Sequence, residues 1–191
     1  MNTHKFTFLA VLFAFLAVTA AWGQNVTTVA DFNARVAAYA TATSDVEIVV
    51  GTNLTLTSLV TIPANANGKT LTIRSANSEE PVVLKRGVSG NLFTVSGGAT
   101  LVLENIIIDG DKDGEFVDGG GSLVRVVQTW TGGTYIYGTL IMKDGAVVRN
   151  NSVTTNDGGG GVLVSSGGTF AMNGGSITGN SELSRKKSIL S

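Results

Sequence analysis

Four stretches of this chain repeat one pattern, a threonine followed by large apolar residues at the second and fourth positions. The copies are 70–74, 100–104, 139–143 and 169–173. Their starts lie 30, 39 and 30 residues apart, and self-similarity with a period of roughly 20 to 50 residues is typical of repeat folds. The chain is therefore predicted to fold as a stack of similar turns.

Each copy has the pattern of a short strand with one buried face. Its apolar residues alternate with polar ones, as they do where successive side chains point to opposite sides of a sheet. The apolar pairs are Leu71 and Ile73, Leu101 and Leu103, Leu140 and Met142, and Phe170 and Met172. Further apolar runs at 93–95 and 162–164 precede two copies, and Val147 and Ile177 follow two. Three strands per repeat, divided by Gly, Asn and Ser corners, predict an all-β fold in which each repeat is one turn of a parallel β-helix.

The N-terminus has the features of a secretory signal peptide. Lys5 precedes an apolar run at 6–21, and small residues stand three and one positions before Gln24. This pattern predicts cleavage after Gly23 and removal of residues 1–23. The run is shorter than the about 20 residues of a membrane span. We therefore expect export and no integral membrane span after cleavage; retention as an uncleaved anchor is the alternative.

Composition excludes several classes of function. The chain has no cysteine, which excludes disulfides, thiolate metal sites and a cysteine nucleophile. Its formal charge is −1 and would be −2 without Lys5. Nucleic acid is therefore not an expected partner, because such proteins usually carry a basic patch.

The remaining chain is predicted to divide into three parts. Residues 24–45 form an N-terminal capping segment, in which Thr28-Val29-Ala30-Asp31 resembles a capping box with Asp for Glu and begins a helix over about 29–40. This helix would cover the open end of the first turn. Residues 46–180 form about five turns, beginning with strands at 46–50 and 54–62.

The C-terminal residues 181–191 form a basic tail unrelated to the repeats. An uncapped last turn would expose a sheet edge and an apolar cross-section. We therefore expect the chain to be a truncated piece with missing C-terminal turns or a missing domain. The alternative is that a partner covers its last turn.

Near the end of the repeats the residues resemble a known family. The segments that carry the resemblance are residues 160–164, 168–173 and 174–180. They are similar to repeats of exported bacterial right-handed parallel β-helix proteins, namely the polymorphic outer membrane proteins and adhesin-like surface proteins of the pectate-lyase-like superfamily. Phe170 and Asn173 match the motif Phe-x-x-Asn, and Gly174, Gly175 and Ile177 match Gly-Gly-Ala-Ile with Ser176 in place of Ala.

The resemblance implies a non-catalytic scaffold or adhesion module that is secreted or held at the cell surface or outer membrane. Its partner would be a host or matrix surface ligand or a polysaccharide. Because pectate lyases share the scaffold, the alternative is a calcium-dependent polysaccharide-binding or lyase-like β-helix.

An acidic loop is the one candidate metal site. Its carboxylates are Asp109, Asp111, Asp113, Glu115 and Asp118. The alternation of the first four, with a glycine at the sixth position, matches the first half of a calcium loop. The twelfth position is Gly120 instead of the bidentate Glu. An ordinary acidic surface loop is the alternative, because Asp and Gly also favour turns.

An insertion at 128–137 explains the 39-residue spacing. Its central Gly-Gly, between two strand-like runs, predicts a two-residue hairpin. That register pairs Trp130 with Tyr135 and Gln128 with Tyr137 on one face, where aromatic rings beside an amide could hold a sugar. The alternatives are that the rings pack back on the core, or that 135–142 is one uninterrupted strand.

The sequence shows no set of catalytic residues, so no enzyme is expected. Its one histidine, His4, lies in the predicted signal peptide. A lyase of the resembled superfamily would need an arginine base beside carboxylates, and nothing in the sequence places Arg125 or Arg149 beside the acidic loop. The glycine runs at 119–121 and 158–161 lack the Lys-Ser/Thr ending of a phosphate loop, so corners between turns are the better interpretation.

Overall fold

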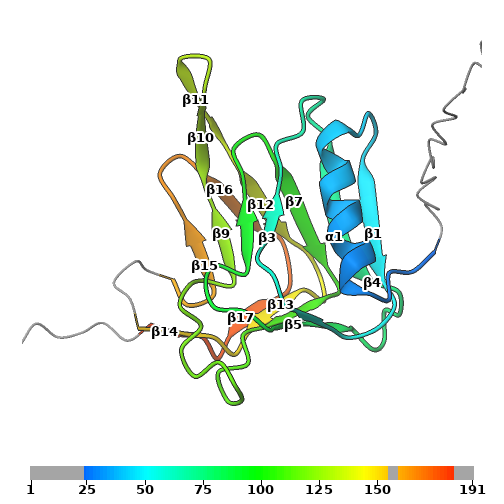
Figure 1. The fold of residues 1–191 in the computed structure, drawn as a ribbon, viewed down its shortest axis with the longest axis vertical. Coiled ribbons are helices and arrows are strands. Elements are labelled where there is room, and N and C mark those ends of the chain that lie inside the picture. The colour runs from blue at the N-terminus through cyan, green and yellow to red at the C-terminus, as the bar shows by residue number, and fades with distance from the viewer. Residues whose placement is uncertain (1–23, 155–158, 183–191) are drawn as a thin grey trace, which may run out of the picture.

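The computed structural model describes residues 24–154 and 159–182. The predicted signal peptide and residues 183–191 of the basic tail lie outside the described residues. Within the described part, the chain is built of strands, mostly in parallel sheets, with one α-helix, α1 (Val29–Ala38), and a 3-10 turn (Tyr39–Thr41) (Figure 1). The prediction of an all-β fold is confirmed.

Three parallel sheets contain most of the strands. Sheet A has the order β1 (Val46–Val50), β4 (Thr70–Ser75), β7 (Thr100–Glu104), β12 (Thr139–Met142), β16 (Thr169–Met172). Sheet B has the order β17 (Ser176–Thr178), β13 (Val147–Arg149), β8 (Ile107–Asp109), β5 (Val83–Arg86), β2 (Leu54–Leu56). Sheet C has the order β15 (Val162–Val164), β9 (Val124–Val126), β6 (Phe93–Val95), β3 (Val60–Ile62).

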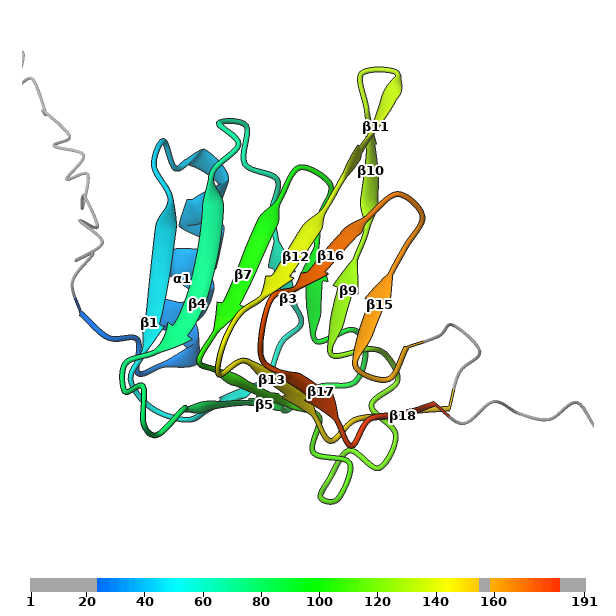
Figure 2. The same cartoon turned by 180° about the vertical axis from the view of Figure 1, so that it is seen from behind.

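Two strand pairs complete the described elements. β14 (Ser152–Val153) pairs with β18 (Ser181–Glu182) in parallel. β10 (Gln128–Thr131) and β11 (Thr134–Tyr137) form the one antiparallel pair among the described strands. Figure 2 shows this hairpin extending beyond the corners of the neighbouring strands.

The chain visits sheets A, B and C in the same order four times, and its last described strands β16 and β17 lie in sheets A and B. The four repeated stretches lie side by side in sheet A, with Thr70, Thr100, Thr139 and Thr169 in one register. Their predicted adjacency is therefore correct. The inward apolar residues of β4, β7 and β12 have no exposed surface, and they build the core of the molecule.

One predicted strand is wrong. The segment 54–62 is two strands, β2 and β3, separated by a corner at residues 57–59. Buried residues recur at 54, 56, 60 and 62, so the alternation keeps its phase across the corner. A period-two pattern that continues in phase cannot reveal such a break.

A helix is present at the N-terminal end, where one was predicted. The amide of Asp31 donates to Thr28 Oγ1 at 3.1 Å, which satisfies one of the free amides of the first turn. Buried Phe32 and Val36 face strands β1, β2 and β3, and Phe32 meets Phe93 edge to face at 6.4 Å between ring centroids. The α-helix ends two residues earlier than predicted and continues as the 3-10 turn.

The opposite end of the three sheets has no such cover within the described residues. Val164, Met172 and Ile177, on the last strands of these sheets, are exposed. Their register partners on the neighbouring strands, at positions 126, 142 and 148, are fully buried. Apolar side chains are therefore open to solvent at this end of the described part.

Charged side chains on the outer face of sheet A pair across neighbouring strands. Lys143, which holds the same repeat position as Glu104, pairs with it at 3.1 Å. Arg74 is a register partner of Glu104 but binds Glu47 on β1, with Nε to Oε1 at 2.6 Å and Nη2 to Oε2 at 3.0 Å. Glu47 lies outside the repeated stretches, so the alignment of copies could not include it.

A buried arginine was not predicted. Arg86 stands at the end of β5 with no exposed surface, and its guanidinium donates to a ring of main-chain carbonyls. The distances are 2.9 Å to Val88, 2.6 Å to Gly90 and 3.1 Å to Gly119 from Nη1, and 3.1 Å to Gly121 and 3.5 Å to Ser122 from Nη2. Burial lowers the pKa of Arg86 to about 10, against the opposing charge of Asp118. Arg86 thereby joins the corner after β5 to the loop before β9.

Candidate functional site

A row of polar residues crosses the outer face of sheet B. One residue from each of the five strands shares the register: Thr55, Lys85, Asp109, Arg149 and Thr178. The residue before each of them belongs to the inward apolar row, so alternation turns these five outward. Since neighbouring strands lie about 4.7 to 4.9 Å apart, the row places charges from distant parts of the sequence side by side.

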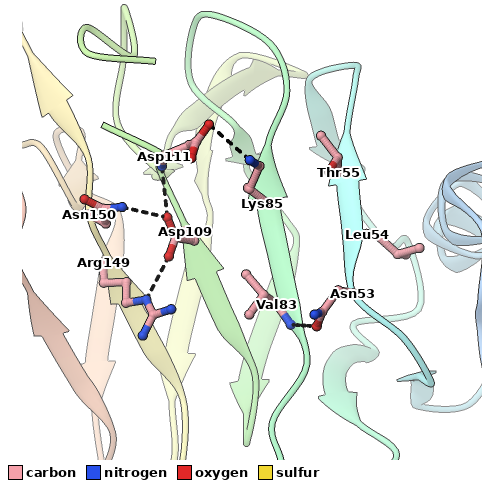
Figure 3. Close-up of a pocket in the computed structure, with 9 residues that line it drawn as sticks. All are labelled: Asn53, Leu54, Thr55, Val83, Lys85, Asp109, Asp111, Arg149 and Asn150. Atoms are coloured by element: carbon pink, nitrogen blue, oxygen red, sulfur yellow. Dashed lines mark hydrogen bonds and ion pairs between the residues drawn. The ribbon is translucent and has the colours of Figure 1, made fainter. Parts of the chain in front are cut away.

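Asp109 is the centre of this row (Figure 3). Its Oδ2 accepts from Arg149 Nε at 2.8 Å, and its Oδ1 accepts from the Asp111 amide at 2.9 Å and Asn150 Nδ2 at 3.1 Å. Burial raises the pKa of this carboxyl, but these hydrogen bonds and the charge of Arg149 together lower it below the ordinary 3.8. Asp109 is therefore held as a carboxylate.

Two adjoining hollows flank Asp109. One of about 340 Å³ extends toward β2 and includes Lys85, which pairs with Asp111 at 3.2 Å. The other, of about 350 Å³, extends toward the corner after β17. Arg149 lines both hollows. Within the described residues its Nη1 and Nη2 have no protein partner, so they remain available to a ligand.

The sequence did not place Arg149 beside the acidic loop, although the structure does. Arg149 is 40 residues from Asp109, and only the pairing of β8 with β13 brings them together. The available signal was the repeat itself, since Asp109 and Arg149 hold equivalent positions in successive turns. Arg125 lies on β9 in sheet C.

The five predicted calcium ligands are not gathered around one point. Asp109 and Asp111 are paired with Arg149 and Lys85. Asp113 and Glu115 are exposed. Asp118 accepts from the Thr154 hydroxyl and the Gly120 amide, which lower its pKa. Among residues 24–154 and 159–182, no three His, Cys, Asp or Glu side chains form a group that could hold a metal ion; calcium binding remains a prediction.

The hairpin has the predicted register. Gln128 opposes Tyr137, and Trp130 opposes Tyr135. Gly132 and Gly133 form its turn with φ of 60° and 84°, a left-handed backbone that glycine adopts readily. The alternative of one strand over 135–142 is wrong, because Gly138 separates β11 from β12.

The predicted aromatic residues gather on the hairpin and stay in contact with solvent. Trp130 is 59% exposed, Tyr135 47% and Tyr137 44%. The rings of Trp130 and Tyr135 meet at 4.7 Å between centroids with an angle of 66°. The ring of Tyr137 also packs against the corner at Gly167, so packing on the neighbouring strands and binding of a ligand both remain open.

Comparison with known proteins identifies no family for this chain, so the proposed function depends on the geometry described above. No protein-family model, no curated protein and no solved structure matches this chain. Among the described residues, no helix has the length and apolar character needed to cross a membrane.

Proposed function

We propose that this chain is an exported, non-catalytic right-handed parallel β-helix that acts as a scaffold or adhesion module of a bacterial surface or secreted protein. The observation that carries the proposal is the shared register of the four repeated stretches in sheet A. The regular order A, B, C of the strands supports a coil in which each repeat adds one turn.

This arrangement of parallel sheets is suited to presenting loops at the surface of the molecule. Parallel sheets with an in-register apolar interior make a stiff support, because every turn is bonded to the turns beside it. On this support stand a projecting hairpin and the loop at residues 110–123. Loops on a rigid scaffold are where recognition residues are most often found. The apolar leader at 6–21 supports export.

The test is surface display in a bacterial host. A short epitope would be inserted between Gly132 and Gly133, where the turn has open space around both glycines. Intact cells, the medium and lysed cells would then be probed for the epitope. We expect it on intact cells or in the medium, with the leader removed. An epitope found only after lysis would contradict the proposed export.

A second candidate is a calcium-dependent polysaccharide-binding or lyase-like β-helix. One observation favours it: Arg149 lies beside Asp109 at the edge of two open hollows. Calcium would have to displace Lys85 and Arg149 from the carboxylates. The test is a calcium titration that follows melting temperature and cleavage of polygalacturonate. A calcium-dependent rise in melting temperature with cleavage that Arg149→Met abolishes would favour this candidate over the scaffold.

A further inference from the structure

The hairpin has an uncharged aromatic face, formed by Gln128, Trp130, Tyr135 and Tyr137. Residues that oppose each other in an antiparallel pair share a face, as do residues two apart on one strand. The register of β10 and β11 thus gathers these four side chains on one side. The three rings stay 44 to 59% exposed, so their apolar surface is open to a ligand that stacks on aromatic side chains.

The aromatic face is held by two glycine corners. On one side, the amide of Gly97 donates to Thr129 Oγ1 at 3.1 Å, and the amide of Gly98 donates to the Tyr137 carbonyl at 3.0 Å. On the other side, the ring of Tyr137 occupies the space that a Cβ at Gly167 would need. The base of the hairpin is therefore fixed between two turns, which reduces the entropy lost when a ligand binds.

The size of the aromatic face selects a small ligand. The ladder has four residue pairs, so the face measures roughly 14 Å by 10 Å at the usual strand dimensions. That area, on the order of 150 Å², is far below the about 800 Å² that each partner buries in a standard protein interface. It is enough for one or two rings of a ligand.

The chemistry of the aromatic face selects a neutral sugar. Residues 128–137 contain no charged side chain. A nucleobase also stacks on aromatic rings, but its phosphates require basic residues that this segment lacks. A pyranose ring offers an apolar face to Trp130 or a tyrosine and hydroxyls to the Gln128 amide and the phenol groups.

We propose that the aromatic face binds neutral pyranose units of a polysaccharide. This inference rests on the proposed scaffold function and deepens it by naming the ligand class that the module would hold. Trp130 supplies the main stacking surface, since it is the most exposed of the three rings. Tyr137, fixed on Gly167, supplies a second.

The test is calorimetric titration of the purified full chain with cellohexaose, mannohexaose and hexagalacturonate. Trp22 belongs to the leader expected to be removed, and Trp22→Phe makes Trp130 the single tryptophan of any chain that retains it, so the emission reports the hairpin directly. The variants are Trp130→Ala and Tyr137→Ala. The matched control is Leu59→Ala, which removes another exposed apolar side chain at a corner of a different turn. Circular dichroism melting checks that each variant is folded.

We expect a neutral hexaose to bind and to shift Trp130 emission, and Trp130→Ala to weaken binding about tenfold or more, the effect of losing an aromatic anchor. Leu59→Ala should bind as the parent does. Absence of saturable binding at millimolar sugar would overturn the inference. Binding of hexagalacturonate alone, or binding lost in Arg149→Met but kept in Trp130→Ala, would overturn it too. The display experiment tests the scaffold proposal separately. If the epitope is found on intact cells but the purified chain binds no sugar, only the inference about the aromatic face is overturned.

Discussion

Replacing Arg86 by methionine tests whether a buried guanidinium holds the loop before β9. The carbonyls of Val88 and Gly90 receive no other donor among the described residues, whereas those of Gly119, Gly121 and Ser122 each accept a second hydrogen bond. Hydrogen bonds to charged groups contribute about 1.5 to 3 kcal/mol each, so losing the two unreplaced bonds predicts a loss of about 3 to 6 kcal/mol.

Burial opposes this contribution, because it disfavours the charged guanidinium and lowers the pKa of Arg86 to about 10. We therefore expect the loss to lie at the lower end, about 3 kcal/mol, which is a large part of the about 5 to 15 kcal/mol that stabilises a typical domain. Arg86→Lys should have an intermediate effect, because one ammonium cannot reach both groups of carbonyls that Nη1 and Nη2 bind.

The assay is urea denaturation followed by circular dichroism, with Lys85→Met as the matched control. Lys85 precedes Arg86 on the same strand, but its side chain is 44% exposed and its one ion pair is with Asp111. Exposed ion pairs contribute at most about 1 kcal/mol, so the control should unfold near the parent midpoint. Equal small losses in Arg86→Met and Lys85→Met would refute the structural role of Arg86.

Three further outcomes follow from the structure. Gly167→Ala should lower the melting temperature more than Gly133→Ala, because both have φ near 80° but only Gly167 faces a ring; equal losses would contradict the packing of Tyr137. The lowered pKa of Asp109 means that its stabilisation is present above the ordinary 3.8 and is lost as pH falls through the folded value. Melting of Asp109→Asn should therefore vary less with pH between about 4 and 2 than melting of the parent. Leu101→Asp should unfold the sheet by burying an unpaired charge, while Lys143→Ala should change stability by less than about 1 kcal/mol; similar small effects would reverse the inward and outward assignment.

Local patterns predicted the parts of the fold that depend on neighbours in sequence. The threonine-led stretches predicted which strands lie side by side, because their equivalent positions repeat and a one-residue slip would turn the apolar face outward. The pair Gly132-Gly133 predicted the hairpin and its register, since a two-residue turn determines which residues face each other. Thr28 predicted the start of the helix, because its side chain caps an amide three residues later.

Two features of the fold depended on contacts that no local pattern carries. Alternation could not separate β2 from β3, because the corner between them keeps the phase of the buried residues. Alternation turns Arg86 inward with Leu84, but no local pattern shows that main-chain carbonyls of the loop at 119–122 accept hydrogen bonds from its guanidinium.

The sequence by itself determined the period, the inward face of each repeat, the hairpin and the N-terminal cap. All of these follow from residues within one strand, one turn or one repeat. The tertiary structure decided that Asp109 binds Arg149 and that Tyr137 rests on Gly167. Such pairs form across neighbouring turns, where distance in space is set by the stacking of strands and by the shape of each corner.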